Sequence, residues 1–505
     1  MSRAQVPRWV PFALVLALAL AWRLLLMGRY YGWEESDYGN LAMVRGVLDG
    51  HFLHYDMNHM PGYYALGAAL LAVVGDTVVA ARGVTLLGGL VSVGLAMWLA
   101  ERLAGRTAAL LAGLLLVVQP ELALYSTSSL REPVYAAFVL GMLAALSRER
   151  LVLAGTLAGA AFLVRFDAAL VLGPILALHA LGRAPRPRRL VGALVPLCLT
   201  ILAWSAYCAV DHGTPWFWQH AVDVNVETGL GAEATGRGEW VLDGLRVAGT
   251  LGAWLLPWRI GWGTWLGLLL GLALAPWRSH GLGRTWAALA LAMTGFWLGI
   301  GFSAQHSPDH NLYWKWLCPV VPVIVPLGVA GLLRVGSRLR PGLAAALVGL
   351  ALVQAGASNL KETRRQLQRS EAWYGPQLRL AQWIEATVPE DVPMLLDNIP
   401  ACWIGRRDNE RPLTSWFDVP APPDDPDAFA AWVAQAHLRY VMWFREDWTQ
   451  APVVAPFLAA GGTWSRGSVR LVETGREDGY GWIFFEVQER GQDAVPVLDA
   501  PPGDG

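Results

Sequence analysis

The chain enters its first apolar run at VPFALVLALALAWRLLLM (residues 10–27) and leaves it through the acidic stretch GRYYGWEESDYGN (residues 28–40). A transmembrane helix needs roughly 20 mostly apolar residues, and this run approaches that length. Trp22 and Arg23 interrupt the run and no small-residue cleavage site follows it, so we interpret it as a retained helix rather than a signal peptide. The sequence therefore predicts a membrane protein whose first helix opens into an acidic loop.

Composition divides the chain into a membrane part and a water-exposed part. Hydrophobic residues make up 54% and charged residues only 16%, whereas a soluble domain carries about 25% charge. The deficit lies in residues 1–358, where apolar runs alternate with basic breaks. We expect a transmembrane domain over 1–358, an extracytoplasmic domain over 359–491 and a disordered Pro-, Gly- and Asp-rich tail over 492–505. The arginine clusters lie between apolar runs and form no basic groove, which argues against nucleic-acid binding.

Charge asymmetry assigns a side of the membrane to each break between the apolar runs. About eleven spans are predicted, at residues 10–27, 82–100, 107–125, 133–147, 151–165, 166–182, 190–210, 258–276, 285–303, 314–333 and 341–358. With the N-terminus inside, the cytoplasmic breaks are 101–106, 147–150, 182–189, 277–284 and 334–340. All five are basic, as cytoplasmic loops are, and nearly all the acids fall outside. The sequence therefore predicts a multi-pass protein of the plasma (inner) membrane with a cytoplasmic N-terminus and an extracytoplasmic C-terminal domain.

Two short segments in the first external loop are predicted as helices that do not span. Residues 62–75 are apolar but too short to cross, and a crossing there would invert the polarity of every later loop. We interpret them as an interfacial or re-entrant helix. Residues 39–48 read as a short amphipathic helix before it.

The C-terminal domain reads as a small α/β layer structure. Helical spacing covers residues 371–387, 425–436 and 451–460, and strand patterns cover 393–397, 438–444, 464–473 and 481–488. It holds no phosphate-binding glycine loop, so we expect it to serve acceptor recognition or to support a lid rather than to catalyse.

Three acids gather where the chain leaves the first helix: Glu34, Glu35 and Asp37. Acids at the membrane edge often mark a functional site, although a solvated loop that merely follows the charge asymmetry has the same composition. A His-Met-Pro element at His59 follows them, and Arg82 opens the next long helix.

This order resembles the GT-C membrane glycosyltransferases, which include protein O-mannosyltransferases and the aminoarabinose transferases of lipid A. Members carry an Asp-Glu pair after helix one, then a His-Pro-Pro or Lys-Pro-Pro element, then an arginine opening the second helix. The resemblance covers about residues 10–360 and implies a GT-C fold. It puts Glu34 at the acceptor-binding Asp, Glu35 at its partner, His59 in the His/Lys-Pro-Pro element and Arg82 at the helix-opening Arg. The chain departs from the pattern in having Glu for Asp and Met60 for the first Pro.

For two further external residues, the resemblance implies a functional role, but a purely structural role would explain the sequence as well. Glu132 matches the acid that ends the family's second external loop, but it would also pair with Arg131 or cap the helix that follows. Arg165 matches a basic residue near the lipid phosphate, but with Asp167 it would equally form a structural salt bridge or a membrane-edge anchor. Both alternatives stay open at the level of sequence.

The loop before the span at 314–333 departs from the family. Where the family has Arg-Tyr, the chain has Leu312-Tyr313, and we expect Lys315 to replace the missing charge. The loop also holds His306, Asp309 and His310, whose spacing fits no zinc signature, so a divalent metal is left open. The four cysteines form no CxxC pair, and no disulfide framework or cysteine metal site is expected.

The resemblance implies a hexosyl- or pentosyltransferase of the cell envelope. It would move a sugar from a polyprenyl-phosphate donor to a hydroxyl of a lipid, glycan or protein acceptor at the extracytoplasmic face. The expected general base is Glu34, with Glu35 and Glu132 orienting the acceptor. The expected substrate-binding residues are Asp37, His59, Arg82, Arg165, Tyr313 and Lys315. Two alternatives remain: a transporter or flippase of a lipid-linked precursor, although no internal repeat is present, and a noncatalytic family member.

Overall fold

The computed structural model describes most of the chain, in segments. These are residues 9–30, 35–48, 60–183, 186–211, 213–216, 260–274, 282–304, 312–389, 392–396, 413–415, 425–444, 455–477 and 482–489, with isolated positions at 7 and 50. The chain divides into two compact units. The first comprises residues 1–32 and 40–368, and the second comprises 33–39 and 369–505. The boundary predicted after residue 358 falls inside one continuous helix, α16 (Pro341–Thr387).

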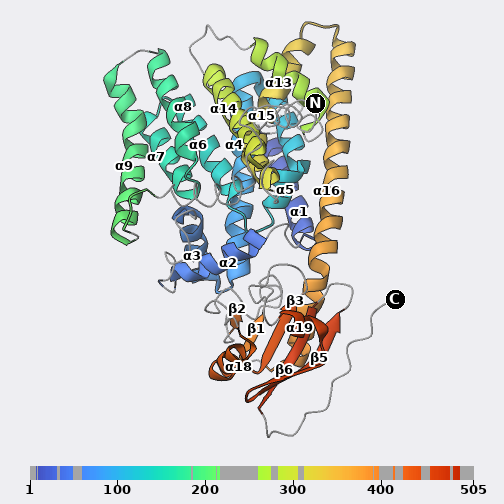
Figure 1. The fold of residues 1–505 in the computed structure, drawn as a ribbon. Helices are drawn as coiled ribbons and strands as arrows, with labels where there is room; N and C mark the ends of the chain where they lie inside the picture. The colour runs from blue at the N-terminus through green and yellow to red at the C-terminus, as the bar shows by residue number, and fades with distance from the viewer. Residues whose placement is uncertain are drawn as a thin grey trace, which may run out of the picture. The chain divides into compact units, whose positions relative to one another are not determined.

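The first unit is helical (Figure 1). Before α16, its described helices are α1 (Val10–Met27), α2 (Glu35–Leu48), α3 (Pro61–Val74), α4 (Thr77–Val118), α5 (Pro120–Tyr125), α6 (Glu132–Ser147), α7 (Leu151–Val164), α8 (Ala168–Arg183), α9 (Pro187–Asp211), α13 (Trp262–Leu274), α14 (Leu282–Ala304) and α15 (Leu312–Gly336). The first residues of α2 group with the second unit.

The protein is an integral, multi-pass membrane protein. Five described helices are long and apolar enough to cross a bilayer: α1, α4, α9, the part of α15 from Lys315, and α16 to Ala372. Four shorter apolar helices, α3, α6, α7 and α8, accompany them. The predicted bounds of α1 are those found, and those of α6 to α9 differ from the observed bounds by at most three residues. The count of eleven spans stays a prediction.

The long helix α4 is a hairpin of two helices. Its backbone leaves helical geometry at Ala104 and Gly105, where Gly105 has φ of 84°, a conformation that glycine adopts without steric cost. A Cβ atom placed on Gly113 would lie 2.6 Å from Sδ of Met97. In a straight helix these two residues would be about 24 Å apart, so the halves must fold back on each other. The turn falls in the basic break predicted at 101–106.

Helix α3 is enclosed by its neighbours on one face. The hydroxyl of Tyr63 donates to the Ala81 carbonyl oxygen at 3.3 Å and contacts Thr85 at the same distance. A Cβ on Gly67 would lie 2.6 Å from Val44 of α2. Its opposite side carries exposed Leu66 and Val73. The helix has 14 residues, as has α7, which is fewer than the roughly 20 of a typical spanning helix. Its interpretation as a non-spanning segment stays a prediction.

Helix α15 is the most enclosed of the long apolar helices described. In the most apolar 18-residue stretch of α15, 83% of the residues are buried, against 22% in the corresponding stretch of α1. It packs on α4, α5, α6, α13 and α14. The indole Nε1 of Trp286 on α14 donates to the Val323 carbonyl oxygen at 2.8 Å. Helix α15 is therefore enclosed by neighbours on several sides, and one of these neighbours is α6.

The second unit contains a six-stranded sheet in its described part. The strand order is β2 (Leu413–Ser415), β1 (Met394–Leu396), β3 (Tyr440–Phe444), β6 (Trp482–Glu489), β5 (Val469–Glu477), β4 (Thr463–Arg466). The strands β2, β1 and β3 are parallel neighbours, and the remaining pairs are antiparallel. Two helices accompany the sheet, α18 (Pro426–Gln435) and α19 (Ala455–Ala460). The predicted small α/β domain is confirmed.

Side-chain alternation gives this sheet two buried faces. On β3, Val441 and Trp443 join the cluster packed with Phe429 of α18. Met442, between them, joins the cluster on the other face with Ile384 of α16. This is the period of two that a strand imposes. The strand predicted at 464–473 is two strands, β4 and β5, joined at Gly467, whose φ is 54°.

Candidate functional site

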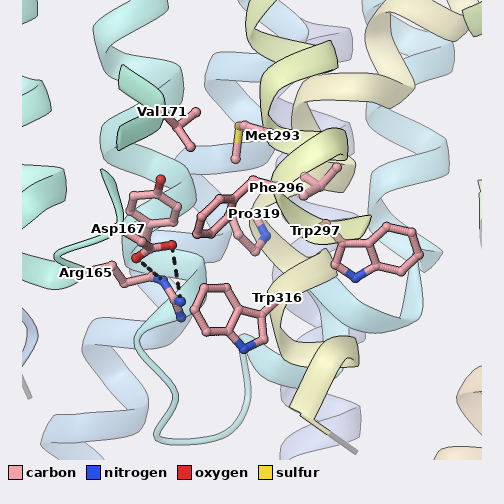
Figure 2. Close-up of a pocket in the computed structure, with 10 residues that line it drawn as sticks. Arg165, Asp167, Val171, Met293, Phe296, Trp297, Trp316 and Pro319 are labelled. Carbon is pink, nitrogen blue, oxygen red and sulfur yellow. Dashed lines mark hydrogen bonds and ion pairs between the residues drawn. The ribbon is translucent and has the colours of Figure 1, made fainter. Parts of the chain in front are cut away.

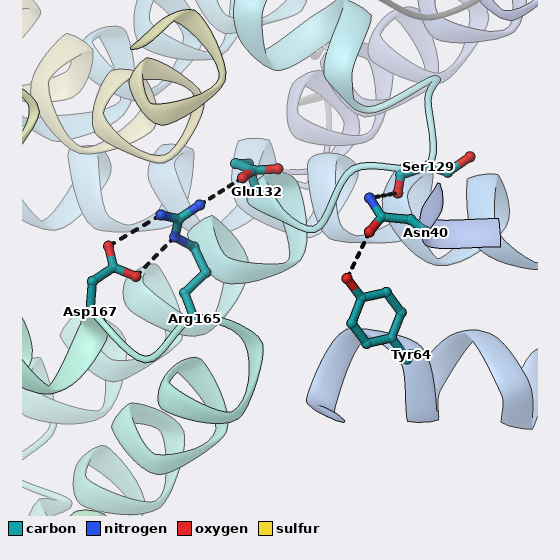
Figure 3. A network of polar contacts seen from close by, with 6 residues as sticks. All are labelled: Asn40, Tyr64, Ser129, Glu132, Arg165 and Asp167. Atoms are coloured by element: carbon teal, nitrogen blue, oxygen red, sulfur yellow. Dashed lines mark hydrogen bonds and ion pairs between the residues drawn. The ribbon is translucent and has the colours of Figure 1, made fainter. Parts of the chain in front are cut away.

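A buried ion triad joins the starts and ends of three helices. The Nη1 of Arg165 donates to Oε1 of Glu132 at 2.7 Å. Its Nε and Nη2 donate to the two carboxylate oxygens of Asp167 at 3.0 and 3.4 Å. Figure 3 shows the guanidinium group between the two carboxylates. The side chains are 3% exposed for Arg165, 2% for Glu132 and 6% for Asp167, so the triad is shielded from water.

Local sequence explains why these three residues reach the same place. Glu132 is the first residue of α6, and Pro133 follows it at a position that suits proline. Arg165 ends α7 in extended conformation, with φ of −149° and ψ of 119°. Asp167 immediately precedes α8. Both acids lie at helix N-termini, where the helix dipole favours negative charge.

Aromatic rings cover the guanidinium group of Arg165. Its Cζ lies 3.5 Å from the centre of the Trp316 ring and 5.9 Å from that of Tyr135. Trp316 in turn contacts Phe296, with ring centres 5.9 Å apart. The cavity beside these side chains, shown in Figure 2, measures about 10 Å³. The cavity therefore has room for about one water molecule and is too small for a sugar or a lipid.

Some hydrogen-bonding atoms of the triad have no partner within it. A guanidinium group has five N–H donors, and three are directed at carboxylates here. Oε2 of Glu132 is buried and has no hydrogen-bond partner within the described residues. Two carboxylates facing one guanidinium leave one formal negative charge. The Glu132 carboxylate pairs with Arg165, rather than with its neighbour Arg131.

A second polar group fixes the loop that leads to Glu132. The hydroxyl of Tyr64 on α3 donates to Oδ1 of Asn40 at 2.7 Å. Nδ2 of Asn40 on α2 donates to the carbonyl oxygen of Ser129 at 3.0 Å (Figure 3). Asn40 and Ser129 are almost fully buried. One amide therefore ties α2 and α3 to the loop three residues before Glu132.

The acids of the first loop lie at the start of α2 or before it. Glu35 is the first residue of this helix and Asp37 lies in its first turn. Both group with the second unit, and their side chains are outside the described set. Glu34 and His59 lie outside the described residues, so their roles stay predictions.

The element that follows His59 packs against the end of α7. Met60 is fully buried as the N-cap of α3, and Pro61 is the first helical residue. A Cβ on Gly62 would lie 2.8 Å from the carbonyl carbon of Leu163. The backbone at Gly62 therefore contacts Leu163, which lies two residues before Arg165. Only glycine permits so close an approach.

The predicted phosphate-side cations occupy different positions. Arg82, on α4, lies one turn before Thr85, whose hydroxyl donates to the Leu130 carbonyl oxygen at 3.3 Å. Within the described part of the chain, the buried Nε of Arg82 has no hydrogen-bond partner. Lys315 is half-buried on α15, directly before Trp316. Tyr313 lies in the same helix, and its side chain is outside the described set.

Two fully buried charged residues were not among the predicted site residues, although Arg23 was noted as an interruption of the first apolar run. Arg23 of α1 donates from Nη1 to the Ala19 carbonyl oxygen at 3.2 Å, while its Nε and Nη2 have no partner among the described residues. Glu121 of α5 accepts a hydrogen bond from Gln119. Both lie within electrostatic range of the Cys318 thiol, as do Glu132 and Arg165. The available signal was a charge inside an apolar run, which often marks a functional position.

No group of three metal-ligating side chains occurs among the described residues. The His306, Asp309 and His310 group and Cys402 lie outside them. Cys198, Cys208 and Cys318 are free thiols. A divalent metal therefore stays an open expectation.

Comparison with known proteins identifies the fold. The model of the dolichyl-phosphate-mannose-protein mannosyltransferase family matches residues 58–218. The crystal structure of ArnT from Cupriavidus metallidurans in the apo state is similar with a TM-score of 0.62 and 17% identity, covering 94% of this chain and 97% of ArnT. The same protein bound to undecaprenyl phosphate gives a TM-score of 0.63 and 16% identity over the same shares. No curated protein matches the chain in sequence. The resemblance to the GT-C superfamily is confirmed at the level of fold.

Proposed function

We propose that the chain is a glycosyltransferase that moves a sugar from a polyprenyl-phosphate donor to an acceptor hydroxyl at the extracytoplasmic face of the membrane. The observation that carries the proposal is the fold shared with ArnT along nearly the whole length of both chains. The structure of ArnT with undecaprenyl phosphate supports a lipid-phosphate donor. The family match over 58–218 includes His59, Arg82, Glu132 and Arg165 and supports the same class of donor.

The reaction requires a base on one side of the sugar and cations on the other. A carboxylate takes the acceptor hydroxyl proton while the oxygen attacks the anomeric carbon. The bond from that carbon to the phosphate oxygen breaks, and the polyprenyl phosphate leaves with the electron pair. Cations near the phosphate stabilise the charge that develops there. We assign the base to Glu34, with Glu35 and Asp37 close to it in sequence.

The described residues suggest separate tasks for the other predicted groups. Arg82 has a buried nitrogen without a partner among the described residues, and Lys315 is half-buried, which suits both to a phosphate. Oε2 of Glu132 is an unpaired acceptor, which suits it to a substrate hydroxyl or a bridging water. Arg165 is engaged by Glu132, Asp167 and Trp316. We therefore assign Arg165 and Asp167 a positioning role toward Glu132, in place of phosphate binding.

The proposal also assigns the sides of the membrane. The basic breaks support a cytoplasmic N-terminus in the plasma (inner) membrane, with the acidic first loop and the sheet domain outside. This orientation follows from the charge of the loops alone, whatever the oligomeric state, the sugar or the acceptor.

The test is a transfer assay with the purified full-length protein. It is incubated in lipid nanodiscs with polyprenyl-phosphate hexoses and pentoses and with lipid, glycan and protein acceptors. Released polyprenyl phosphate and the new glycoside are read by mass spectrometry, and we expect both to appear together for one donor class. If neither product appeared with any donor–acceptor pair, the proposal would be overturned.

A parallel experiment separates transferase from transporter. The protein is placed in sealed vesicles with a labelled polyprenyl-phosphate sugar on one side. Movement of intact label across the bilayer, with no new glycosidic bond, would establish the flippase alternative. A transferase produces the glycoside whether or not the vesicle is sealed.

A further inference from the structure

A second cavity, which shares no residue with the charged site, is lined by residues of α4, α6 and α7 and of the turn between α6 and α7. It measures about 300 Å³. Its apolar wall consists of Leu95, Gly141, Ala144, Ala145 and Leu153, and its polar rim consists of Trp98, Arg148 and Arg150. We call it the Trp98 pocket. The α6–α7 turn, residues 147–150, borders it through Arg148 and Arg150 and is one of the basic breaks predicted to be cytoplasmic.

Three arginines converge on the rim of this pocket. The Cζ atoms of Arg102 and Arg148 lie 4.6 and 4.7 Å from the centre of the Trp98 ring. Arg150 lines the cavity beside them. Arg102 also donates to the Ser147 carbonyl oxygen at 3.4 Å, which links α4 to the turn. The indole ring attracts both cations but does not neutralise their charge.

The acid within this turn is directed to other partners. Glu149 has φ of 56°, a left-handed conformation unusual for a non-glycine residue. Its carboxylate accepts from Arg189 of α9 and lies 3.3 Å from Nε2 of His179 on α8. The turn therefore separates its charges, and Arg148 and Arg150 border the cavity. Across the described chain, neither they nor Arg102 has a carboxylate partner.

We propose that the Trp98 pocket binds an anionic phospholipid of the cytoplasmic leaflet. The phosphate lies against Arg148 and Arg150, and an acyl chain follows the wall formed by Leu95, Ala144 and Leu153. Basic pockets between transmembrane helices on the cytoplasmic side recognise anionic lipid headgroups, and tryptophan favours the headgroup level of the bilayer. The apolar wall selects a lipid, because a free inorganic anion gains nothing from it. This site is independent of the proposed transfer reaction.

The test is lipid retention by the purified full-length protein. Native mass spectrometry counts bound phosphatidylglycerol and phosphatidylcholine after delipidation and titration with each lipid. We expect preferential retention of phosphatidylglycerol, weakened on the order of tenfold in R148Q/R150Q, since each basic residue contributes substantially to anionic-lipid attraction. A144F fills the apolar wall without changing charge, and the same loss is expected. The matched control is R338Q/R340Q, which removes two exposed arginines from another basic break and should retain the lipid.

Two further arms locate the ligand and identify its source. A phosphatidylglycerol analogue with a photoreactive acyl chain should label peptides containing Leu95 or Leu153. Inorganic phosphate at millimolar concentration should leave the lipid bound, whereas complete displacement would assign a free-anion site and overturn the lipid proposal. Equal retention of the two lipids by the unaltered protein would overturn it as well. Equal losses in R148Q/R150Q and R338Q/R340Q would attribute the preference to general charge and have the same consequence.

Discussion

Arg165 bonds the carboxylate of Glu132 at 2.7 Å although 33 positions separate them in the chain. The contact joins the end of α7 to the start of α6, and Asp167 completes a triad with one excess negative charge. Burial makes the balance of charge matter, because a charge without a partner is costly away from water. The triad therefore predicts that removal of its cation destabilises the protein far more than removal of one of its anions.

Substitution of Arg165 should destabilise the membrane domain. R165Q leaves two buried carboxylates without a counter-charge, and loss of one partner of a buried pair costs about 3–5 kcal/mol. E132Q instead leaves the balanced pair of Arg165 and Asp167, so it should unfold close to the unaltered protein. The measurement is the fraction of full-length protein that stays monodisperse after heating. R340Q, at an exposed arginine, is the control, and equal stability of R165Q and E132Q would contradict the argument.

The carboxylates assigned to the transfer reaction should affect chemistry with little effect on folding. E34Q removes the assigned base and should lower transfer by a factor on the order of 10² to 10⁴, the usual range for general acid–base catalysis. E132Q should raise the acceptor KM more than it lowers kcat, because its role is to orient. Release of polyprenyl phosphate under saturating donor gives both constants. E101Q, at an exposed acid on α4, should match the unaltered enzyme, and normal turnover by E34Q would remove the base from Glu34.

Much of the architecture was predictable because each element carries its own signal. The apolar run 10–27 is α1, and the basic break at 101–106 contains the hairpin turn of α4. Strand patterns located β1, β3 and β6. Strand β2 was missed because Leu413–Ser415 contains a single apolar residue, whereas β1, of the same length, is apolar throughout. The glycine signal at Gly467 was overlooked, so β4 and β5 were read as one strand.

The site was less predictable because its contacts are distant in sequence. Residue type and position placed Glu132 and Arg165 among the candidates, but no local pattern indicates that they bond each other rather than Arg131 and Asp167 alone. Arg23 and Glu121 were missed for a related reason. A buried charge is recognised by what surrounds it, and in both cases the neighbours come from other helices.

Gly62 should be intolerant of any side chain. An added Cβ would lie 2.8 Å from both the carbonyl carbon and the oxygen of Leu163, and backbone atoms cannot move aside as a flexible side chain does. Overpacking of this kind costs about 1–3 kcal/mol, so G62A should lower the melting temperature and displace the motif from the end of α7. G349A is the matched control. Nothing lies within 4 Å of its added Cβ, and alanine is the better helix former. Equal melting temperatures for the two variants would show that α3 moves freely against α7.

The turn at Gly461 and Gly462 should depend on pH through Glu473. The hydrogen bond from Arg476 lowers the pKa of the Glu473 carboxyl below its ordinary value, and the backbone N–H of Gly462 adds to that effect. Because the folded pKa is the lower one, the stabilisation is fully present above the unfolded pKa and is lost as pH falls through the folded pKa. Hydrogen-exchange protection of peptides covering 461–477 in the full-length protein, corrected for intrinsic rates, should therefore fall below about pH 4.5, near the ordinary range of a glutamate. E473Q should reduce protection at neutral pH and flatten the acid response, while E385Q, on the exposed side of α16, should leave both unchanged. If the profile of E473Q kept its acid limb, another carboxylate would have to control this turn.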